Sequence, residues 1–359
     1  MRWGAVRSVA ACCRRGSPCT SSSRLCLFPR VDLEVLRLLK AGEPGLREWS
    51  GVNKSSLTRA RQRLGWQVVR DLHRAVVRPL GQDSDLFRGL RVLALDGMLL
   101  VVPDSPGNRE AFGKSGSQRS PLGYPMARVV AVAECSSHAV LDAAIGGWKD
   151  SERIVSDDLD RHAGEGTLLL ADRGLWGLAR WHRLREQGAH LLWRIEQRKA
   201  RRVQDVLAAG SYLARIEPSK HSKAARTVKA PPTLVRVIEY QLDGRAEVVR
   251  LITSRLDHNK YKAEELAALY ARRWEIELVS DEIKSHQRDR PVLRSQTPDG
   301  VRQEIFAPLI VHHATRELLG EAARLAQSPA ERTSFVRALH VVRRSVIAPC
   351  GFSPLAPTT

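Results

Sequence analysis

The chain has 359 residues, 43% of them hydrophobic and 27% charged, which is the composition of a globular protein with a substantial core. A net charge of +19 favours a polyanionic partner, most often nucleic acid, although a high-GC genome also enriches surface Arg. No apolar run reaches the roughly 18 residues of a membrane span, and the irregular Cys spacing excludes a disulfide framework and a zinc module.

The N-terminal part divides into a basic arm and a helical segment. Residues 1–30 are rich in Arg and Ser and contain no acidic residue, so we expect a disordered basic arm or a misassigned start codon. In residues 31–85, apolar residues recur at helical spacing, most clearly from Trp66 to Val77. This pattern predicts a small helical N-terminal domain of the DNA-binding kind. A helical module that only packs on its neighbour is the alternative.

Buried strands are predicted from residue 90 onward. The apolar run from Arg91 to Asp104 is interrupted only by Asp96–Gly97, which predicts two strand segments around a tight turn or bulge. Residues 103–125 are rich in Gly, Ser and Pro and are predicted as a loop. A second apolar run begins at Ala127 and predicts a strand, a Ser-rich turn and another strand.

Helices and strands alternate further along the chain. The pattern predicts a helix over 151–163, a strand over 167–171 that ends at Asp172, a helix over 178–186 and a strand over 189–196. The basic stretch 198–232 is predicted as a loop or insertion, and Leu234–Thr253 as a hairpin around Asp243–Gly244. Helices follow over 262–286, from Pro298, and over 330–346. The order indicates a mixed α/β fold with a central sheet.

Three carboxylates stand out by position. Asp96 interrupts an apolar strand, Asp172 ends another, and Glu277 lies within a predicted helix. One interpretation pairs each carboxylate with an Arg. The other brings them together, although two such charges about 4 Å apart repel by roughly 4 kcal/mol at an effective dielectric near 20, so a cation is needed. Oxygen-only ligands suit Mg²⁺ or Mn²⁺, and two such ions support phosphoryl transfer.

The helix with Glu277 carries further polar groups. Tyr270, Arg273, Glu277 and Lys284 follow one another at steps of three, four and seven residues, which return to one helix face. Arg and Lys suit contacts to DNA phosphates by their charge. His312 and His313 lack ligand spacing and are interpreted as core or helix-surface residues.

These motifs together resemble the DDE transposases of the insertion-sequence-four family. The chain matches that family's first aspartate block at Leu93–Gly113, its second in LLLADRGLW, and its Tyr-x2-Arg-x3-Glu-x6-Lys signature from Tyr270 to Lys284. The resemblance extends over about residues 46–345. Any one of these motifs alone is weak, whereas the ordered set is specific.

The resemblance implies an α/β, ribonuclease-H-like mixed sheet flanked by helices. The core would comprise residues 86–197 and 254–346, with a β-rich insertion at 198–253 before the last catalytic helix, a small helical N-terminal domain and a C-terminal tail at 347–359. Asp96, Asp172 and Glu277 would be the catalytic metal ligands for two Mg²⁺ or Mn²⁺ ions. Tyr270, Arg273 and Lys284 would bind DNA.

The resemblance also implies a function. The family cuts the ends of an element and joins the 3′-hydroxyl to target DNA, commonly through a hairpin intermediate, with Trp176, Trp193 and Tyr240 as candidates for a hairpin-stabilising aromatic. We expect a homodimer on paired ends, in the bacterial cytoplasm with the nucleoid and without a membrane. The alternatives are an inactive or domesticated DNA-binding derivative, and a ribonuclease-H-like nuclease without strand joining.

Overall fold

The computed structural model describes residues 54–117, 120–196, 202–207, 210–218, 230–241, 247–283, 291–327 and 333–347. The chain forms two compact units, the first from Met1–Leu80, Leu99–Ala127 and Val279–Thr359, and the second from Gly81–Met98 and Arg128–Leu278. The predicted basic arm, Lys284 and nearly all of the C-terminal tail lie outside the described residues.

The second unit is built on a mixed sheet. β1 (Arg91–Val101) pairs in parallel with β5 (Thr167–Ala171), which pairs in parallel with β6 (His190–Arg194). On the other side of β1 lies β3 (Ser120–Glu134), which also pairs with β4 (Val140–Gly147). Residues Leu168–Ala171 of β5 are fully buried, as expected for a parallel strand covered on both faces.

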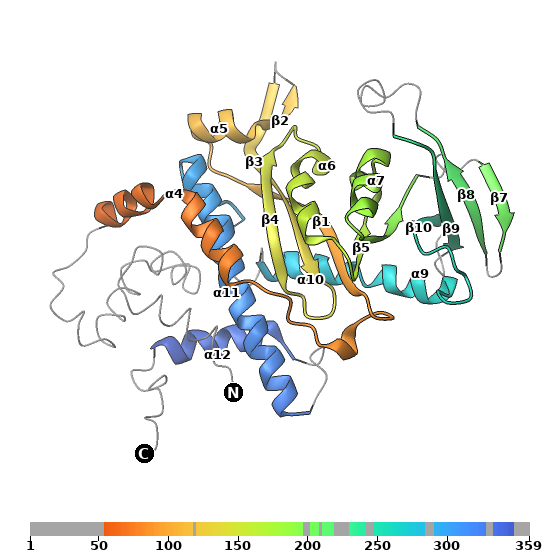
Figure 1. The fold of residues 1–359 in the computed structure, drawn as a ribbon. Coiled ribbons are helices and arrows are strands. Elements are labelled where there is room, and N and C mark those ends of the chain that lie inside the picture. Colours follow the sequence, from red (N-terminus) through yellow and green to blue (C-terminus); the bar gives the residue numbers. More distant parts are fainter. Residues whose placement is uncertain are drawn as a thin grey trace. The chain divides into compact units, whose positions relative to one another are not determined.

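Antiparallel strands extend this sheet beyond β6. They are β10 (Val248–Thr253), β9 (Thr233–Gln241), β8 (Ser211–Ile216) and β7 (Arg202–Val206), in that order (Figure 1). β9 and β10 confirm the predicted hairpin. β7 and β8 fall in the basic stretch 198–232, which the residue pattern alone predicted as a loop or insertion and the family resemblance as part of a β-rich insertion.

Short helices connect the strands of the second unit. α6 (Glu152–Val155) and the 3₁₀ helix η3 (Asp157–His162) follow β4, and η4 (Arg173–Leu175) with α7 (Leu178–Glu186) follows β5. α9 (Ala263–Ala271) and the start of α10 (Trp274–Asp281) come after β10.

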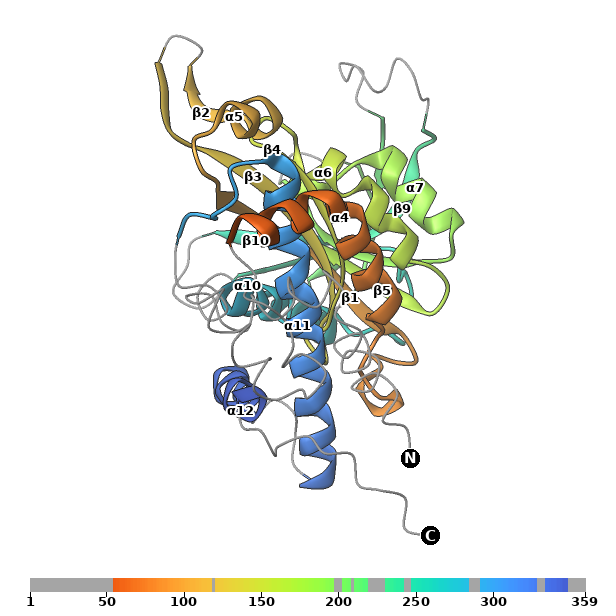
Figure 2. The same cartoon turned by 90° about the vertical axis from the view of Figure 1, so that its left-hand side faces the viewer.

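Helices dominate the first unit. α4 (Lys54–Val76) bends at Gly65, whose φ of 72° is left-handed, and it lies along α11 (Pro298–Leu325) in both views (Figures 1 and 2). The rings of Trp66 and Phe306 stack between these two helices with centroids 6.1 Å apart. α12 (Phe335–Ile347) packs Phe335 and Leu339 against Val311 of α11. The predicted helical segments at 66–77 and from Pro298 are thus confirmed.

Two predictions for the chain between residues 91 and 125 were wrong. β1 continues through Asp96–Gly97 instead of turning there. The stretch 103–125 was predicted as a loop, but it contains α5 (Pro106–Phe112), β2 (Lys114–Ser117) and the start of β3. The Ser105 hydroxyl caps α5 by accepting a hydrogen bond from the Asn108 amide at 3.2 Å, and Pro106 occupies its first turn.

Candidate active site

Strand register brings Asp96 and Asp172 together. Leu95 of β1 and Ala171 of β5 are partners in the parallel pair, and the two aspartates are the residues that follow them. Neighbouring strands lie about 4.8 Å apart, so Asp96, within β1, and Asp172, directly after the end of β5, start from adjacent positions. Asp172 also accepts a hydrogen bond from the Arg173 amide at 2.7 Å, which starts η4.

Asp96 is a carboxyl in an environment that disfavours its charge. Its burial raises its pKa to about 6, and the charges of Glu277 and Glu152 add to this shift. The charge of Arg273 and a hydrogen bond from the Gly97 backbone oppose it without cancelling it. A carboxyl that is short of positive charge is typical of functional sites.

Glu277 reaches this site through Arg273. The Arg273 Nη1 lies 3.2 Å from the Asp96 Oδ1, and its Nη2 lies 3.4 Å from the Glu277 Oε1. Glu277 itself is 41% exposed, whereas Arg273 is 7% exposed. The guanidinium therefore bridges two carboxylates on different elements.

Arg273 occupies a break in the predicted helix. The sequence predicted one helix over 262–286, but α9 ends at Ala271 and α10 begins at Trp274. The Arg273 amide bonds to the Tyr270 carbonyl at 3.0 Å and the Ile276 amide to the Arg273 carbonyl at 3.1 Å, a tighter three-residue spacing than that of an α-helix. The prediction of one continuous helix was wrong, and the break coincides with the buried Arg273 guanidinium, which pairs with Asp96 of β1, a contact that local sequence pattern does not record.

Arg273 is a cation shared by the acidic residues. Burial alone would lower its pKa, but neighbouring groups raise it. The groups that do so are Tyr270, Asp96, Asp172 and Glu277. Asp96 and Glu277 each form an ion pair with the Arg273 guanidinium, and Asp172 lies close enough for its charge to raise the pKa of Arg273.

The remaining predicted site residues are placed differently. Tyr270 is only 6% exposed, and burial raises its pKa; the Arg273 guanidinium lies 5.8 Å from its ring centre. Of the candidate aromatics, Trp176 and Trp193 pack in a cluster with Trp181. Among the described residues of α10, the large exposed aromatic is Trp274, at 58%.

Comparison with known proteins decides the family. The model of the family described as "Transposase DDE domain" matches residues 87–312. The Escherichia coli (strain K12) protein "Transposase InsG for insertion sequence element IS4" is 31% identical over 333 residues, which cover 89% of this chain and 73% of that protein. The chain belongs to the insertion-sequence-four family of DDE transposases.

The predicted family and enzyme class are thereby confirmed, and the chain is an insertion-sequence DNA transposase. Among solved structures, a cryo-EM structure of the piggyBac transposase synaptic complex with hairpin DNA matches with a TM-score of 0.41 at 9% identity. That match covers 72% of this chain and 52% of the other. No helix in the described ranges of the transposase has the length and apolarity to cross a membrane.

The acidic residues of the transposase suit a divalent cation in their chemistry. DDE transposases generally use divalent metal ions. Asp96, Asp172 and Glu277 offer only oxygen donors, the type that Mg²⁺ and Mn²⁺ prefer, and they already gather around a cation. Within the ranges that the structure describes, no three His, Cys, Asp or Glu side chains are arranged to hold a metal as they stand. Arg273 lies between Asp96 and Glu277 in this conformation.

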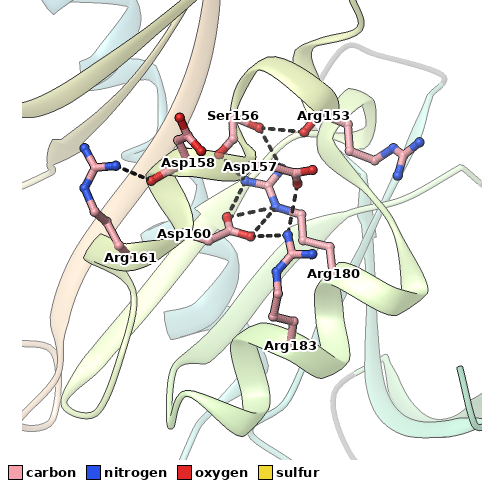
Figure 3. Close-up of polar contacts among 8 residues, drawn as sticks. All are labelled: Arg153, Ser156, Asp157, Asp158, Asp160, Arg161, Arg180 and Arg183. Atoms are coloured by element: carbon pink, nitrogen blue, oxygen red, sulfur yellow. Dashed lines mark hydrogen bonds and ion pairs between the residues drawn. The ribbon is translucent and has the colours of Figure 1, made fainter. Parts of the chain in front are cut away.

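A buried ionic network braces the elements that carry the site (Figure 3). Arg180 of α7 donates to the Asp160 Oδ1 at 2.6 Å and to the Ser156 hydroxyl at 2.8 Å. Arg183 reaches Asp160 at 2.6 Å from the next turn of α7. Ser156 ends α6, and α7 follows the Asp172 turn, so the network fixes the helix after β4 against the helix after β5. Sequence reasoning missed it, although the pairs of Asp and Arg in the two segments were a usable signal.

Proposed function

We propose that Asp96, Asp172 and Glu277 are the catalytic metal ligands of this transposase, holding two Mg²⁺ or Mn²⁺ ions. The observation that carries the proposal is the register of β1 and β5, which places Asp96 and Asp172 at neighbouring positions of the sheet. Arg273 contacts both Asp96 and Glu277 and so brings Glu277 to the same place. When bound, such ions activate a water or a 3′-hydroxyl and stabilise the leaving oxygen of a phosphodiester. The enzyme would cut element ends and join the 3′-hydroxyl to target DNA.

The residues of the chain divide the work by charge. The raised pKa of Asp96, about 6, still leaves its carboxylate ionised at neutral pH and able to bind a cation. Arg273 compensates the carboxylates in the conformation described here. If a divalent cation compensated these carboxylates, the Arg273 guanidinium would be free to bind a phosphate in the bidentate manner that its planar fork favours.

DNA binding would involve the signature residues around Glu277. Arg273 and Lys284 would supply positive charge for phosphates near the element end. The Tyr270 ring, which lies against the Arg273 guanidinium, would help to hold that side chain in place. The net charge of +19 supports a DNA partner. We further propose a homodimer on paired ends, a ribonuclease-H-like core at 86–197 and 254–346 with an insertion at 198–253, and a DNA-binding helical domain at 31–85.

A cleavage and joining assay tests this function. The full chain is incubated with Mg²⁺ and DNA that carries the inverted repeats flanking its own gene, with and without target DNA. We expect nicked and joined products, and a loss of at least about 100-fold in Asp96→Asn, Asp172→Asn and Glu277→Gln, because each change removes an anionic ligand.

The outcomes separate the alternatives. Asp158→Asn is the matched control, since Asp158 is an exposed aspartate of the same unit, and it should retain activity. Binding without cleavage by the unaltered protein would indicate an inactive derivative. Cleavage without joining would indicate a nuclease. Full activity in any of the three variants would remove that residue from the metal site.

A further inference from the structure

A fourth carboxylate, that of Glu152, lies against the glycines that follow Asp96 and Asp172 in the chain. Glu152 is the first residue of α6, and its side chain is seated on two glycines of the same unit. A Cβ atom added at Gly97 would lie 2.6 Å from the Glu152 Cδ, and one added at Gly174 would lie 3.2 Å from its Oε2. The carboxylate therefore bridges the strand that bears Asp96 and the turn that begins at Asp172.

The position of the Glu152 carboxylate explains why glycine occupies both positions. Gly97 directly follows Asp96, and Gly174 lies two residues after Asp172. Neither has the positive φ that requires glycine, so their backbones would accept another residue. The missing Cβ atoms make room for Glu152, which gives a physical role to the glycines of the Asp-Gly and Asp-Arg-Gly motifs.

Glu152 also acts on the site electrostatically. Its carboxylate lies close enough to Asp96 for the two charges to interact. Arg128 of β3 donates to its Oε1 at 2.8 Å and holds it there. The plain alternative is an ion pair that only fastens α6 to the sheet. An ion pair alone would not require glycine at both Gly97 and Gly174, where a Cβ atom would collide with or crowd the same carboxylate.

We propose that Glu152 is a supporting carboxylate of the catalytic centre, which positions β1 at Gly97 and the turn after β5 at Gly174 and supplies negative charge that strengthens divalent-cation binding by Asp96 and Asp172. This inference rests on the proposed function. Groups that surround metal ligands without being required as ligands commonly change metal affinity by about 10- to 100-fold.

Cation binding by the DNA-free protein tests the role of Glu152. Mn²⁺ affinity is measured by isothermal titration and by electron paramagnetic resonance of free Mn²⁺. Glu152→Gln keeps the shape but removes the charge, and we expect at least about a tenfold weaker affinity. Glu165→Gln, at an exposed glutamate of the same unit, should bind Mn²⁺ as the unaltered protein does. Excess Mn²⁺ should restore DNA cleavage by Glu152→Gln but not by Asp96→Asn.

A second pair of variants addresses the seat itself. Gly97→Ala should push the Glu152 carboxylate away and weaken Mn²⁺ binding to a similar extent. In the Glu152→Ala background the same Gly97→Ala change should add no further loss, because no carboxylate remains to collide. A further loss of Mn²⁺ affinity in that background would mean that the added methyl group acts through the backbone. It would refute the claim that Gly97 makes room for the Glu152 carboxylate.

The results distinguish this inference from the function on which it rests. If the unaltered protein binds no Mn²⁺, or if Asp96→Asn binds it equally well, the proposed metal site fails. If Asp96→Asn loses binding while Glu152→Gln matches the unaltered protein in affinity and Mn²⁺ dependence, the role of Glu152 alone is refuted. Near-ultraviolet circular dichroism of each variant identifies loss of binding that comes from misfolding, and such a loss in Glu152→Gln would leave only the fastening role.

Discussion

At the scale of single residues, the proposed function requires a negative charge on Asp96, and burying that charge destabilises the folded protein. Its folded pKa of about 6 exceeds the ordinary value of 3.8, so the penalty is absent below pH 3.8, grows between the two values and is complete above about 6. Asp96→Asn removes the charge with little change in shape. We expect it to abolish cleavage but to stabilise the metal-free protein by about 2 kcal/mol at pH 8. Thermal unfolding with chelator measures this.

The pH dependence provides the control for Asp96→Asn. The gain should shrink toward zero at pH 4, where the unaltered Asp96 is protonated in the folded protein. Asp158→Asn, at an exposed site, should change stability little at either pH. A destabilised Asp96→Asn at pH 8 would contradict the assignment of Asp96 as a strained carboxylate.

Arg273 is expected to have the opposite effect. Removing a buried cation leaves its carboxylates without compensation, so Arg273→Gln should destabilise the metal-free protein by about 3 kcal/mol at pH 8. Mn²⁺ should recover much of this loss, because it supplies the missing positive charge. Arg215→Gln, at an exposed position of β8, is the matched control and should show neither effect. If Mn²⁺ did not change the unfolding of Arg273→Gln, the idea that Mn²⁺ and the Arg273 guanidinium compensate the same carboxylates would be refuted.

The sequence could identify the acidic residues but not their neighbours. Asp96 interrupts an apolar run, Asp172 ends another, and the signature spacing marks Glu277, so all three can be recognised from the sequence alone. The position of Glu152 becomes meaningful only when Gly97 and Gly174 meet it in space. The pairing of Arg273 with Asp96 likewise joins residues far apart in the chain.

At the scale of elements, the contact between Arg180 and Asp160 holds α7 to η3. Both side chains are nearly fully buried, and Arg180→Met would leave the Asp160 charge with Arg183 as its one remaining ion-pair partner in the part of the chain that the structure describes. We expect a loss of about 3 kcal/mol in thermal or denaturant unfolding. Arg183→Met, at a side chain 44% exposed, should cost about 1 kcal/mol or less. Equal losses for the two variants would argue against burial as the cause.

Element prediction succeeded where local pattern and tertiary packing agree. β5 and α7 have the predicted bounds, because a short apolar run and a compact amphipathic stretch each have one favourable arrangement. The interrupted helix around Arg273 depends on a buried ion pair and was not visible in the sequence. α5 could have been found, since Ser105 and Pro106 form a recognisable helix start and Gly113, with a φ of 71°, a recognisable end.

At the scale of the whole molecule, the sequence indicated a mixed sheet but not its extent. The predicted hairpin turned out to continue the sheet, because β10 pairs antiparallel with β6. Which strand a hairpin joins depends on contacts between distant segments, such as Ile252 beside Trp193, and no periodicity records them. The division into two units likewise joins segments that are separated in the chain.

The stability of the molecule in acid should be limited by a histidine of the helical unit. His313 of α11 is 2% exposed, and burial, with the nearby charges of His73, His312 and Arg78, lowers its pKa to about 3. The unfolded chain, with an ordinary pKa of 6.5, binds a proton that the folded state refuses, so stability falls as pH drops from 6.5 toward 3. The loss from this group should be about 2 kcal/mol at pH 5. Unfolding temperatures between pH 7.5 and 5 measure it.

His313→Leu should flatten that pH dependence. Neither ring nitrogen of His313 has a hydrogen-bond partner among the described residues, so an apolar side chain of similar volume removes the titrating group without stranding a partner. His340→Leu alters an exposed histidine of α12 and should leave the acid slope unchanged. If His313→Leu lost stability in acid as steeply as the unaltered protein, the acid sensitivity would have to originate in other groups.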